Sequence, residues 1–264
     1  MVKKVTAILI FMLVFPFICT VEGQAYGGFL CKDCLEHGII GIQYPTEDGI
    51  RYKVAISKGP ETYYYDYFGK GTEYFPLQFG NGEYNIALLK NVTGNKYMVV
   101  QKDTVQLNLA DENTVYLQSV QNIRYKPEMK AVLKANELTY GLSGAFEKVK
   151  AVYEYVVSNI EYDYNAGFLS DKQYIPDIES TFINKKGICY DYASLFAGML
   201  RSVGIPAKLV MGYSENVEGY HAWNEVFIDG SWVTIDTTYD ATAGQGKNVK
   251  MIKDKKEYRT IKYY

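Results

Sequence analysis

The stretch from Lys185 to Asp240 constrains the fold more than any other part of the chain. Cys189 opens a run in which apolar residues recur every three or four positions, the spacing of one face of an α-helix. The apolar positions are Tyr192, Phe196, Met199 or Leu200, and Val203, and Gly204 ends the run. The pattern predicts a helix that begins at Cys189. Unpaired N–H groups and the positive end of the helix dipole favour a thiolate there, and the thiolate is the nucleophilic form of cysteine.

A β-hairpin is predicted towards the end of this stretch. Apolar runs flank Asp229-Gly230, a dipeptide preferred in two-residue hairpin turns. In that register His221 faces Thr238 and Trp223 faces Asp236, so Asp236 lies diagonally across from His221 on the same face, at roughly 7–8 Å. A carboxylate in that position can hold the imidazole ring, provided that no bulge shifts the register.

Four motifs in this order resemble the catalytic core of the transglutaminase-like superfamily, in a form typical of bacterial secreted members. They are Gly-x-Cys-x-(Asp/Glu)-x-Ala at Gly187, Cys189, Asp191 and Ala193; Gly-Ile-Pro-Ala from Gly204 to Ala207; His-Ala-Trp from His221 to Trp223; and Trp-x-x-Ile-Asp-x-Thr at Trp232, Ile235, Asp236 and Thr238. The resemblance covers roughly residues 140–240. It implies a papain-like α+β fold in which Cys189 is the nucleophile, His221 the general base and acid, and Asp236 the residue that orients the histidine.

Each of these three residues also has an ordinary structural interpretation. A cysteine that opens a helix more often packs than reacts, a strand histidine is usually a satisfied polar residue, and an aspartate after a strand usually caps a turn. Together they favour catalysis, because the hairpin brings a base and its orienting acid together while the helix start supplies the nucleophile.

The resemblance is incomplete in two respects. Animal transglutaminases carry a tryptophan upstream of the nucleophile that helps to stabilise the oxyanion, whereas Trp223 and Trp232 both lie downstream of Cys189. The backbone N–H of Cys189 is one replacement, and the Tyr162 hydroxyl is a weaker one. The acidic calcium-binding insertions of the animal enzymes are absent as well, so we predict no metal and no cofactor.

Residues 1–25 are predicted to be an export signal. Two lysines precede an apolar run over residues 7–18, and Gly23-Gln24-Ala25 provides a small-residue cleavage site after Ala25. A membrane anchor is the alternative, but the run is shorter than the roughly 20 residues that a span needs. We therefore predict a secreted or extracytoplasmic protein with no stable membrane insertion after cleavage.

Removal of Cys19 with the signal would leave an odd number of cysteines: Cys31, Cys34 and Cys189. In an exported protein the closely spaced Cys31 and Cys34 are expected to form a disulfide, which leaves Cys189 free. A redox-active pair or half of a zinc site is the alternative, but no second C-x-x-C motif and no βαβ pattern accompany them.

Residues 26–122 are predicted to form a small antiparallel β-sandwich-like domain. Three runs alternate apolar and polar residues, and turn-forming residues separate them. The runs are Tyr52, Val54 and Ile56; Tyr84, Ile86 and Leu88; and Val105, Leu107 and Leu109. The clustered Tyr63, Tyr64, Tyr65 and Tyr67 are interpreted as strand residues that pack on alternate faces, with a stacking platform for sugar or peptide as the alternative.

Residues 123–264 are predicted to form the transglutaminase-like catalytic domain. Pro127 opens a short helical segment and Gly141 closes it. Ser143 is expected to cap a second helix that packs beside the Cys189 helix. Residues 161–184 are expected to be a loop-rich connection whose tyrosines border the cleft.

Composition narrows the class of function. The signal carries two lysines and Glu22, so the net charge of −2 for the whole chain becomes −3 after cleavage, and no basic patch indicates nucleic-acid binding. The predicted function is thiol acyl transfer on amide groups of a protein or peptide substrate, such as a cell-surface protein, through a Cys189 thioester. A cysteine peptidase or deamidase using the same triad, or a non-catalytic surface-binding module, is the alternative.

Overall fold

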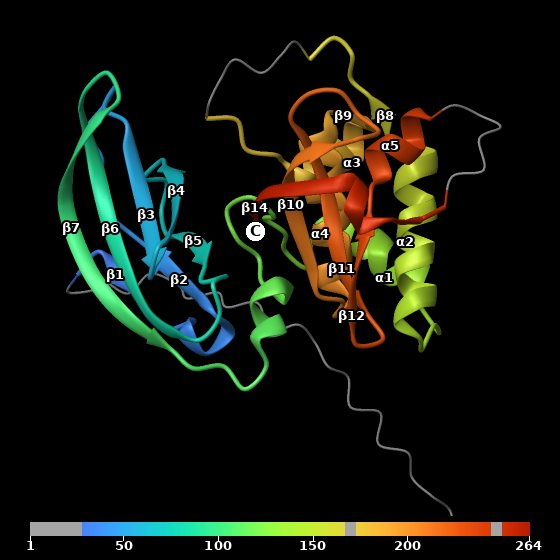
Figure 1. Ribbon diagram of the computed structural model, residues 1–264, viewed down its shortest axis with the longest axis horizontal. Coiled ribbons are helices and arrows are strands. Elements are labelled where there is room, and N and C mark those ends of the chain that lie inside the picture. The colour runs from blue at the N-terminus through green and yellow to red at the C-terminus, as the bar shows by residue number, and fades with distance from the viewer. Residues whose placement is uncertain (1–27, 167–172, 244–249) are drawn as a thin grey trace, which may run out of the picture.

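The computed structural model describes residues 28–166, 173–243 and 250–264. The predicted export signal lies outside these residues. Within them, no helix is both long enough and apolar enough to cross a membrane. The fold is α+β, with a β-rich N-terminal part beside a part that contains five α-helices among the described residues (Figure 1).

The N-terminal part consists of two antiparallel sheets. The larger has the strand order β4 (Glu61–Tyr67), β3 (Tyr52–Lys58), β6 (Gly82–Thr93) and β7 (Lys96–Leu107), and the smaller has the order β1 (Leu30–Cys31), β2 (Ile39–Ile42) and β5 (Glu73–Pro76). The short helix η1 (Leu35–His37) separates β1 from β2. The three alternating runs predicted from the sequence place their apolar residues in the core, which confirms the period-two pattern.

Strand β4 shows how its tyrosines are used. Tyr63, Tyr65 and Tyr67 are buried on one face, whereas Tyr64 on the other face is 55% exposed. Packing therefore explains the cluster, and the alternative of a stacking platform is wrong because three of the four rings are in the core.

The predicted disulfide between Cys31 and Cys34 is wrong. Cys31 has a free, buried thiol, whereas Cys34 is disulfide-bonded. Cys31 lies in β1 and Cys34 caps η1. Close spacing in sequence therefore did not decide the pairing.

The second part is built around helix α4 (Cys189–Ser202), which is buried almost throughout. It packs against α1 (Lys130–Thr139), α2 (Ala145–Asn159) and α3 (Ile178–Asn184), and against strands β10 and β11 on another side. The five-stranded antiparallel sheet has the order β13 (Ile252–Lys253), β12 (Ser231–Ile235), β11 (His221–Ile228), β10 (Ala207–Ser214) and β14 (Tyr258–Tyr263). Helix α5 (Thr237–Thr242) follows β12, and η3 (Lys255–Glu257) precedes β14.

The predicted helices form, with two corrections. Helix α2 packs beside α4 as expected, but its N-cap is Gly144 rather than Ser143. The segment 161–184 is not only loop: it includes strand β8 (Glu161–Tyr162), which pairs in parallel with β9 (Lys186–Gly187), and helix α3. Asp177 caps α3 by accepting a hydrogen bond from the Ser180 N–H, a start signal that is visible in the sequence.

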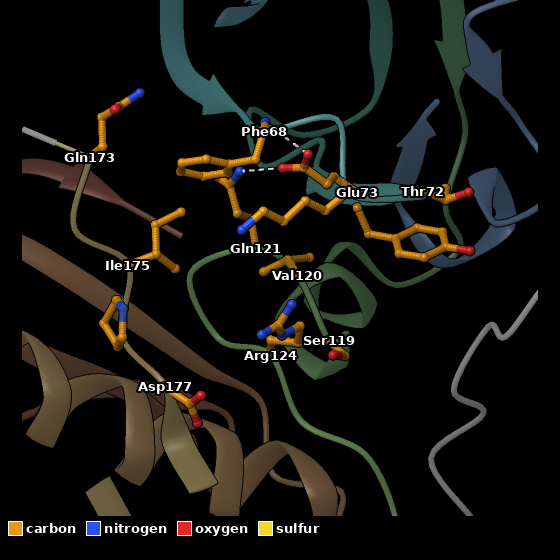
Figure 2. Close-up of a pocket in the computed structure, with 13 residues that line it drawn as sticks. Phe68, Thr72, Glu73, Ser119, Val120, Gln121, Arg124, Gln173, Ile175 and Asp177 are labelled. Atoms are coloured by element: carbon orange, nitrogen blue, oxygen red, sulfur yellow. Dashed lines mark hydrogen bonds between the residues drawn. The ribbon is translucent and has the colours of Figure 1, made fainter. Parts of the chain in front are cut away.

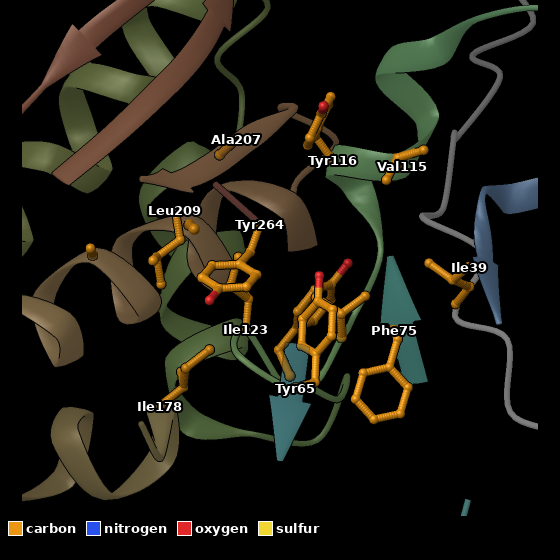
Figure 3. Packing of buried hydrophobic residues seen from close by; sticks show 14 of the residues in the cluster. Ile39, Tyr65, Phe75, Val115, Tyr116, Ile123, Ile178, Ala207, Leu209 and Tyr264 are labelled. Atoms are coloured by element: carbon orange, nitrogen blue, oxygen red, sulfur yellow. The ribbon is translucent and has the colours of Figure 1, made fainter. Parts of the chain in front are cut away.

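One buried apolar cluster runs through both parts (Figure 3). Tyr65 of β4 packs edge-on against Tyr264, with ring centroids 5.7 Å apart, and the Tyr65 hydroxyl accepts a hydrogen bond from Gln78. The Tyr263 N–H donates to the hydroxyl of Tyr63 at 3.2 Å. Tyr263 and Tyr264 therefore lie between the N-terminal sheets and the part that contains the α-helices.

Arg201 holds three segments together inside this core. Its guanidinium, fully buried, donates to the carbonyl oxygens of Gln118, Ala207 and Tyr264 at 2.6, 2.8 and 2.9 Å. Burial lowers the pKa of Arg201 to about 10, so the side chain remains charged at neutral pH. A single cation thus ties α4 to the segment after η2 (Glu112–Leu117), to the start of β10 and to the chain end.

We expect Arg201→Met to lower the free energy of unfolding by about 3 kcal/mol, because three buried carbonyl groups lose charge-assisted hydrogen bonds. Urea denaturation followed by circular dichroism measures the change. Arg124→Met, which replaces an exposed arginine, is the matched control and should change stability by less than about 0.5 kcal/mol. Equal stability of the two variants would contradict this role of Arg201.

Candidate active site

Cys189 is the first residue of α4, as the apolar spacing predicted. The preceding Gly187 lies in β9, opposite Tyr162 in β8. A Cβ atom at Gly187 would lie 2.6 Å from the Cβ of Asp191, so any larger residue would push against the first turn of the helix. Glycine is needed there because the strand passes directly over the helix start.

Asp191 closes the N-terminus of α4. Its Oδ2 accepts a hydrogen bond from the Ile188 N–H at 2.9 Å, and its Oδ1 accepts one from the Tyr174 hydroxyl at 2.5 Å. Burial raises the pKa of this carboxyl group, while the two donors oppose that effect. The acidic residue of the Gly-x-Cys-x-Asp motif thus fixes the turn that carries the thiol.

The predicted hairpin register is confirmed. Phe227 pairs with Trp232 and Asn224 with Ile235, on either side of a turn at Asp229 and Gly230. Both turn residues have positive φ, 49° and 85°, as a primed two-residue turn requires.

The paired region ends one residue before Asp236, which corrects the predicted pairing of His221 with Thr238. Thr238 belongs to α5, and His221 pairs instead with Gly212 of β10 on its other side. Asp236 is the N-cap of α5, where its Oδ1 accepts from the Tyr239 N–H at 2.9 Å. Capping turns the chain and still leaves the other carboxylate oxygen facing the histidine.

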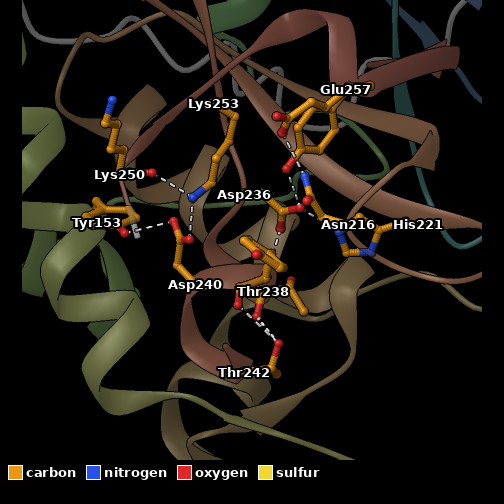
Figure 4. Close-up of polar contacts among 12 residues, drawn as sticks. Tyr153, Asn216, His221, Asp236, Thr238, Asp240, Thr242, Lys250, Lys253 and Glu257 are labelled. Carbon is orange, nitrogen blue, oxygen red and sulfur yellow. Dashed lines mark hydrogen bonds and ion pairs between the residues drawn. The ribbon is translucent and has the colours of Figure 1, made fainter. Parts of the chain in front are cut away.

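His221 and Asp236 are in direct contact (Figure 4). The histidine Nε2 lies 2.8 Å from Asp236 Oδ2, and both side chains are buried. The Tyr258 hydroxyl donates to the same oxygen at 3.1 Å. Asp236 therefore meets three donors, one each from β11, α5 and β14.

The environment of His221 keeps its ring protonated. Burial, the largest influence, lowers the pKa, but hydrogen bonds to Asp236 and then to the Cys189 side chain outweigh it and raise the pKa to about 9. With Nε2 committed to Asp236, Nδ1 is the ring nitrogen left for the thiol. At neutral pH the imidazolium therefore bridges the sulfur and the carboxylate.

Two aromatic rings, those of Trp223 and Tyr258, form a packed layer beside His221. Trp223 stacks near His221, with ring centroids 6.3 Å apart, and packs against Tyr258 at 5.0 Å. Gly212, opposite His221, makes room for this layer, since a Cβ atom there would lie 2.1 Å from the Arg259 carbonyl oxygen and 2.9 Å from the Trp223 ring.

Asn224 fixes the distance between strand β11 and helix α4. Its side-chain amide donates to the carbonyl oxygen of Ala193 in α4 at 2.9 Å and to that of Lys208 in β10 at 3.0 Å. The residue is fully buried. The strand that carries His221 is thereby attached to the helix that carries Cys189.

Helix α5 is also anchored through Asp240, which lies in its first turn (Figure 4). The Tyr153 hydroxyl donates to Asp240 Oδ2 at 2.8 Å, and the Lys253 ammonium pairs with Oδ1. These contacts join α2, α5 and β13, so the helix capped by Asp236 is held from both sides.

The structure brings together Cys189, His221 and Asp236, and it places Tyr162 close enough to Cys189 for their charges to interact. Sequence reasoning missed Tyr258 and Asn224. No spacing signal connects Tyr258 with Asp236, because the two meet only when β14 joins the sheet beside β10. Asn224 directly follows the His-Ala-Trp motif, and its strand position alone did not distinguish it from an ordinary polar residue.

No metal site is evident in the described part of the chain. Among residues 28–166, 173–243 and 250–264, no three histidine, cysteine, aspartate or glutamate side chains converge as metal ligands would. The carboxylates closest to the thiol are already bound to N–H and O–H donors.

Comparison with known proteins gives partial matches that centre on this site. The chain is 33% identical over 104 residues to mouse kyphoscoliosis peptidase, covering 35% of this chain and 15% of that protein. It is 30% identical over 160 residues to the uncharacterized protein YebA of Bacillus subtilis, covering 53% of this chain and 20% of that protein. The chain thus spans a fifth or less of the length of these relatives.

Among solved structures, the periplasmic domain of TgpA from Pseudomonas aeruginosa is similar, with 15% identity, a TM-score of 0.38, and coverage of 80% of this chain and 95% of that one. The family model of the transglutaminase-like superfamily matches residues 134–237, which include the thiol, the imidazole and the carboxylate. Residues 134–237 of this chain are therefore similar to the transglutaminase-like superfamily.

Proposed function

We propose that the chain is an exported thiol acyltransferase that acts on amide groups of protein or peptide substrates through a thioester at Cys189. The observation that carries the proposal is the buried imidazole of His221, whose two nitrogens serve a helix-terminal thiol and a carboxylate. A protonated imidazole beside a cysteine favours the thiolate and is ready to donate a proton.

The proposed reaction has two half-steps. The Cys189 thiolate attacks the amide carbonyl, and the tetrahedral intermediate collapses as His221 gives its proton to the leaving nitrogen, which departs as ammonia or an amine. The thioester is then attacked by an amine or by water, whose proton returns to His221 as the thiolate leaves. Asp236 holds the ring in position and stabilises its positive charge.

Two donors suit the oxyanion of the tetrahedral intermediate. The N–H of Cys189 is one of the unpaired amides at the start of α4. The Tyr162 hydroxyl is the other, because burial and the neighbouring Cys189 raise its pKa and keep it protonated. The β8–β9 pairing places Tyr162 opposite Gly187, and Gly187 lies two residues before Cys189.

The second candidate function is peptide hydrolysis by the same triad. The name of the mouse relative, a peptidase, favours water as the acceptor over an amine. The triad serves both, because attack, oxyanion stabilisation and proton return are the same for either acceptor. A non-catalytic binding module is a third hypothesis. The free thiol beside a base argues against it.

The decisive experiment incubates the protein with a glutamine-bearing protein and a labelled primary amine and reads the products by mass spectrometry. Incorporated amine supports acyl transfer, a gain of about one dalton per site supports deamidation, and chain cleavage supports peptidase activity. Cys189→Ala should abolish every product. Products that persist in Cys189→Ala, or none from several substrates, would contradict a thioester enzyme.

We expect Asp236→Asn to lower turnover by about 10⁴-fold, because the amide cannot stabilise the imidazolium and favours the wrong tautomer. The unmodified enzyme should lose activity above a pH of about 9, where His221 gives up the proton needed by the leaving group.

Removal of the Asp236 charge lowers the pKa of His221, so the alkaline loss of the residual activity should move to lower pH in Asp236→Asn. Steady-state rates between pH 6 and about 10 measure the shift. Asp229→Asn, at the exposed hairpin turn, is the control and should leave the profile unchanged. If the alkaline loss of activity occurs at the same pH in Asp236→Asn, a group other than His221 causes it.

We expect Tyr162→Phe to lower kcat by about 10²-fold with little change in KM, because an oxyanion donor acts mainly on the transition state. Tyr164→Phe is a matched control, since its ring packs edge-on against Tyr162 but is 79% exposed. Equal kcat values for the two variants would contradict a role for Tyr162 and would leave the Cys189 N–H as the oxyanion donor.

A further inference from the structure

A cavity of about 350 Å³ lies outside the Cys189–His221–Asp236 site, between the N-terminal sheets and the part that contains the α-helices (Figure 2). Three segments form its walls: residues 68–74 leading into β5, residues 119–124 after η2, and residues 173–177 before α3. Neither the predicted nor the proposed chemistry uses this space.

The charges in the cavity are unequally satisfied. Lys70 and Arg124 are exposed lining residues, and neither takes part in an ion pair among the described residues. Glu73, by contrast, accepts hydrogen bonds from the N–H groups of Phe68 and Gly69 and from the Gln121 side chain, at 2.8–2.9 Å. Asp177 accepts from the backbone at the start of α3. The two anions are thus engaged, whereas the two cations are available to a ligand.

The remaining walls are apolar. Phe68 and Ile175 face the same space as Arg124 (Figure 2), and Pro176 and Val120 complete the lining. A ligand that pairs with the two cations and also packs on the apolar wall presents a negative charge next to an apolar group. A carboxylate beside an aliphatic or aromatic side chain meets both requirements.

The cavity is directly linked to the proposed active site. Tyr174, which lies between the lining residues Gln173 and Ile175, donates to Asp191 at the start of the catalytic helix. On the opposite wall, Asn122 follows the lining residue Gln121 and donates to the hydroxyl of Tyr190 at 2.5 Å. Tyr190 is the residue after Cys189, and its ring is 6.2 Å from that of Tyr174. Hydrogen bonds from residues adjoining the cavity walls therefore reach the first turn of α4.

We propose that this cavity is a substrate subsite that takes an acidic residue and an adjoining apolar residue of the protein or peptide whose amide reacts at Cys189. Lys70 and Arg124 bind the carboxylate, and Phe68 and Ile175 pack on the apolar side chain. The identification of the ligand as a substrate rests on the proposed function. Binding to the cavity can be tested without turnover.

The test uses Cys189→Ala, so that no reaction occurs, and two acetylated tetrapeptides of glycine, phenylalanine, a variable residue and glycine amide. The variable residue is glutamate in one and glutamine in the other. Nuclear magnetic resonance follows the Ile175 methyl and Gln121 side-chain amide signals, both from cavity walls. We expect the glutamate peptide to shift these signals and to bind about tenfold more tightly than the glutamine peptide.

Lys70→Ala combined with Arg124→Ala should abolish the preference for glutamate. Lys126→Ala combined with Lys130→Ala removes the same charge from exposed positions outside the cavity and should retain the preference. Equal binding of the two peptides, no shift with either, or shifts confined to other signals would overturn the subsite, even if the Lys70 and Arg124 variant fails to fold. Absence of turnover in the mass-spectrometric assay, with the preference intact, would instead count against the proposed function alone.

Discussion

The packing of strand β11 on helix α4 is the constraint on which the site depends. The thiol belongs to the helix and the imidazole to the strand, so their separation is set by how closely the two elements approach. The Asn224 amide fixes that approach by donating to the Ala193 carbonyl oxygen, and α4 also packs against α1, α2, α3 and α5. A helix buried on almost every face cannot slide without disturbing several interfaces, which keeps Cys189 within reach of His221.

The position of the Asp236 carboxylate is also fixed by several contacts. Asp236 ends a strand, caps a helix, and receives the histidine and the Tyr258 hydroxyl, so its position is fixed by elements that are far apart in the sequence. A buried carboxylate is stable only when its oxygens are satisfied, and here each bond that satisfies it also orients it. Burial lowers the pKa of His221, but the hydrogen bonds to Asp236 and to Cys189 outweigh it and raise the pKa.

The N-terminal sheets contribute surface as well as stability. Their contact with the rest of the chain is a continuous apolar cluster, to which Tyr65 and Tyr264 contribute from opposite parts. Where this packing gives way to polar residues, the chain leaves a cavity lined by two exposed cations, and a neighbouring residue, Asn122, is hydrogen-bonded to Tyr190 of α4. In the proposed function, the β-rich part helps to select the substrate, and the helical part with its sheet carries Cys189, His221 and Asp236.

The sequence by itself determined the helix that begins at Cys189, the hairpin at Asp229-Gly230 and the proximity of Asp236 to His221, because these depend on local periodicity, turn chemistry and short spacing. Only the tertiary structure decided what joins them. Tyr258 reaches Asp236 through a strand added from the chain end, and the expected pairing of Cys31 with Cys34 fails. Long-range contacts of this kind depend on how whole elements pack together, which no local pattern of residues encodes.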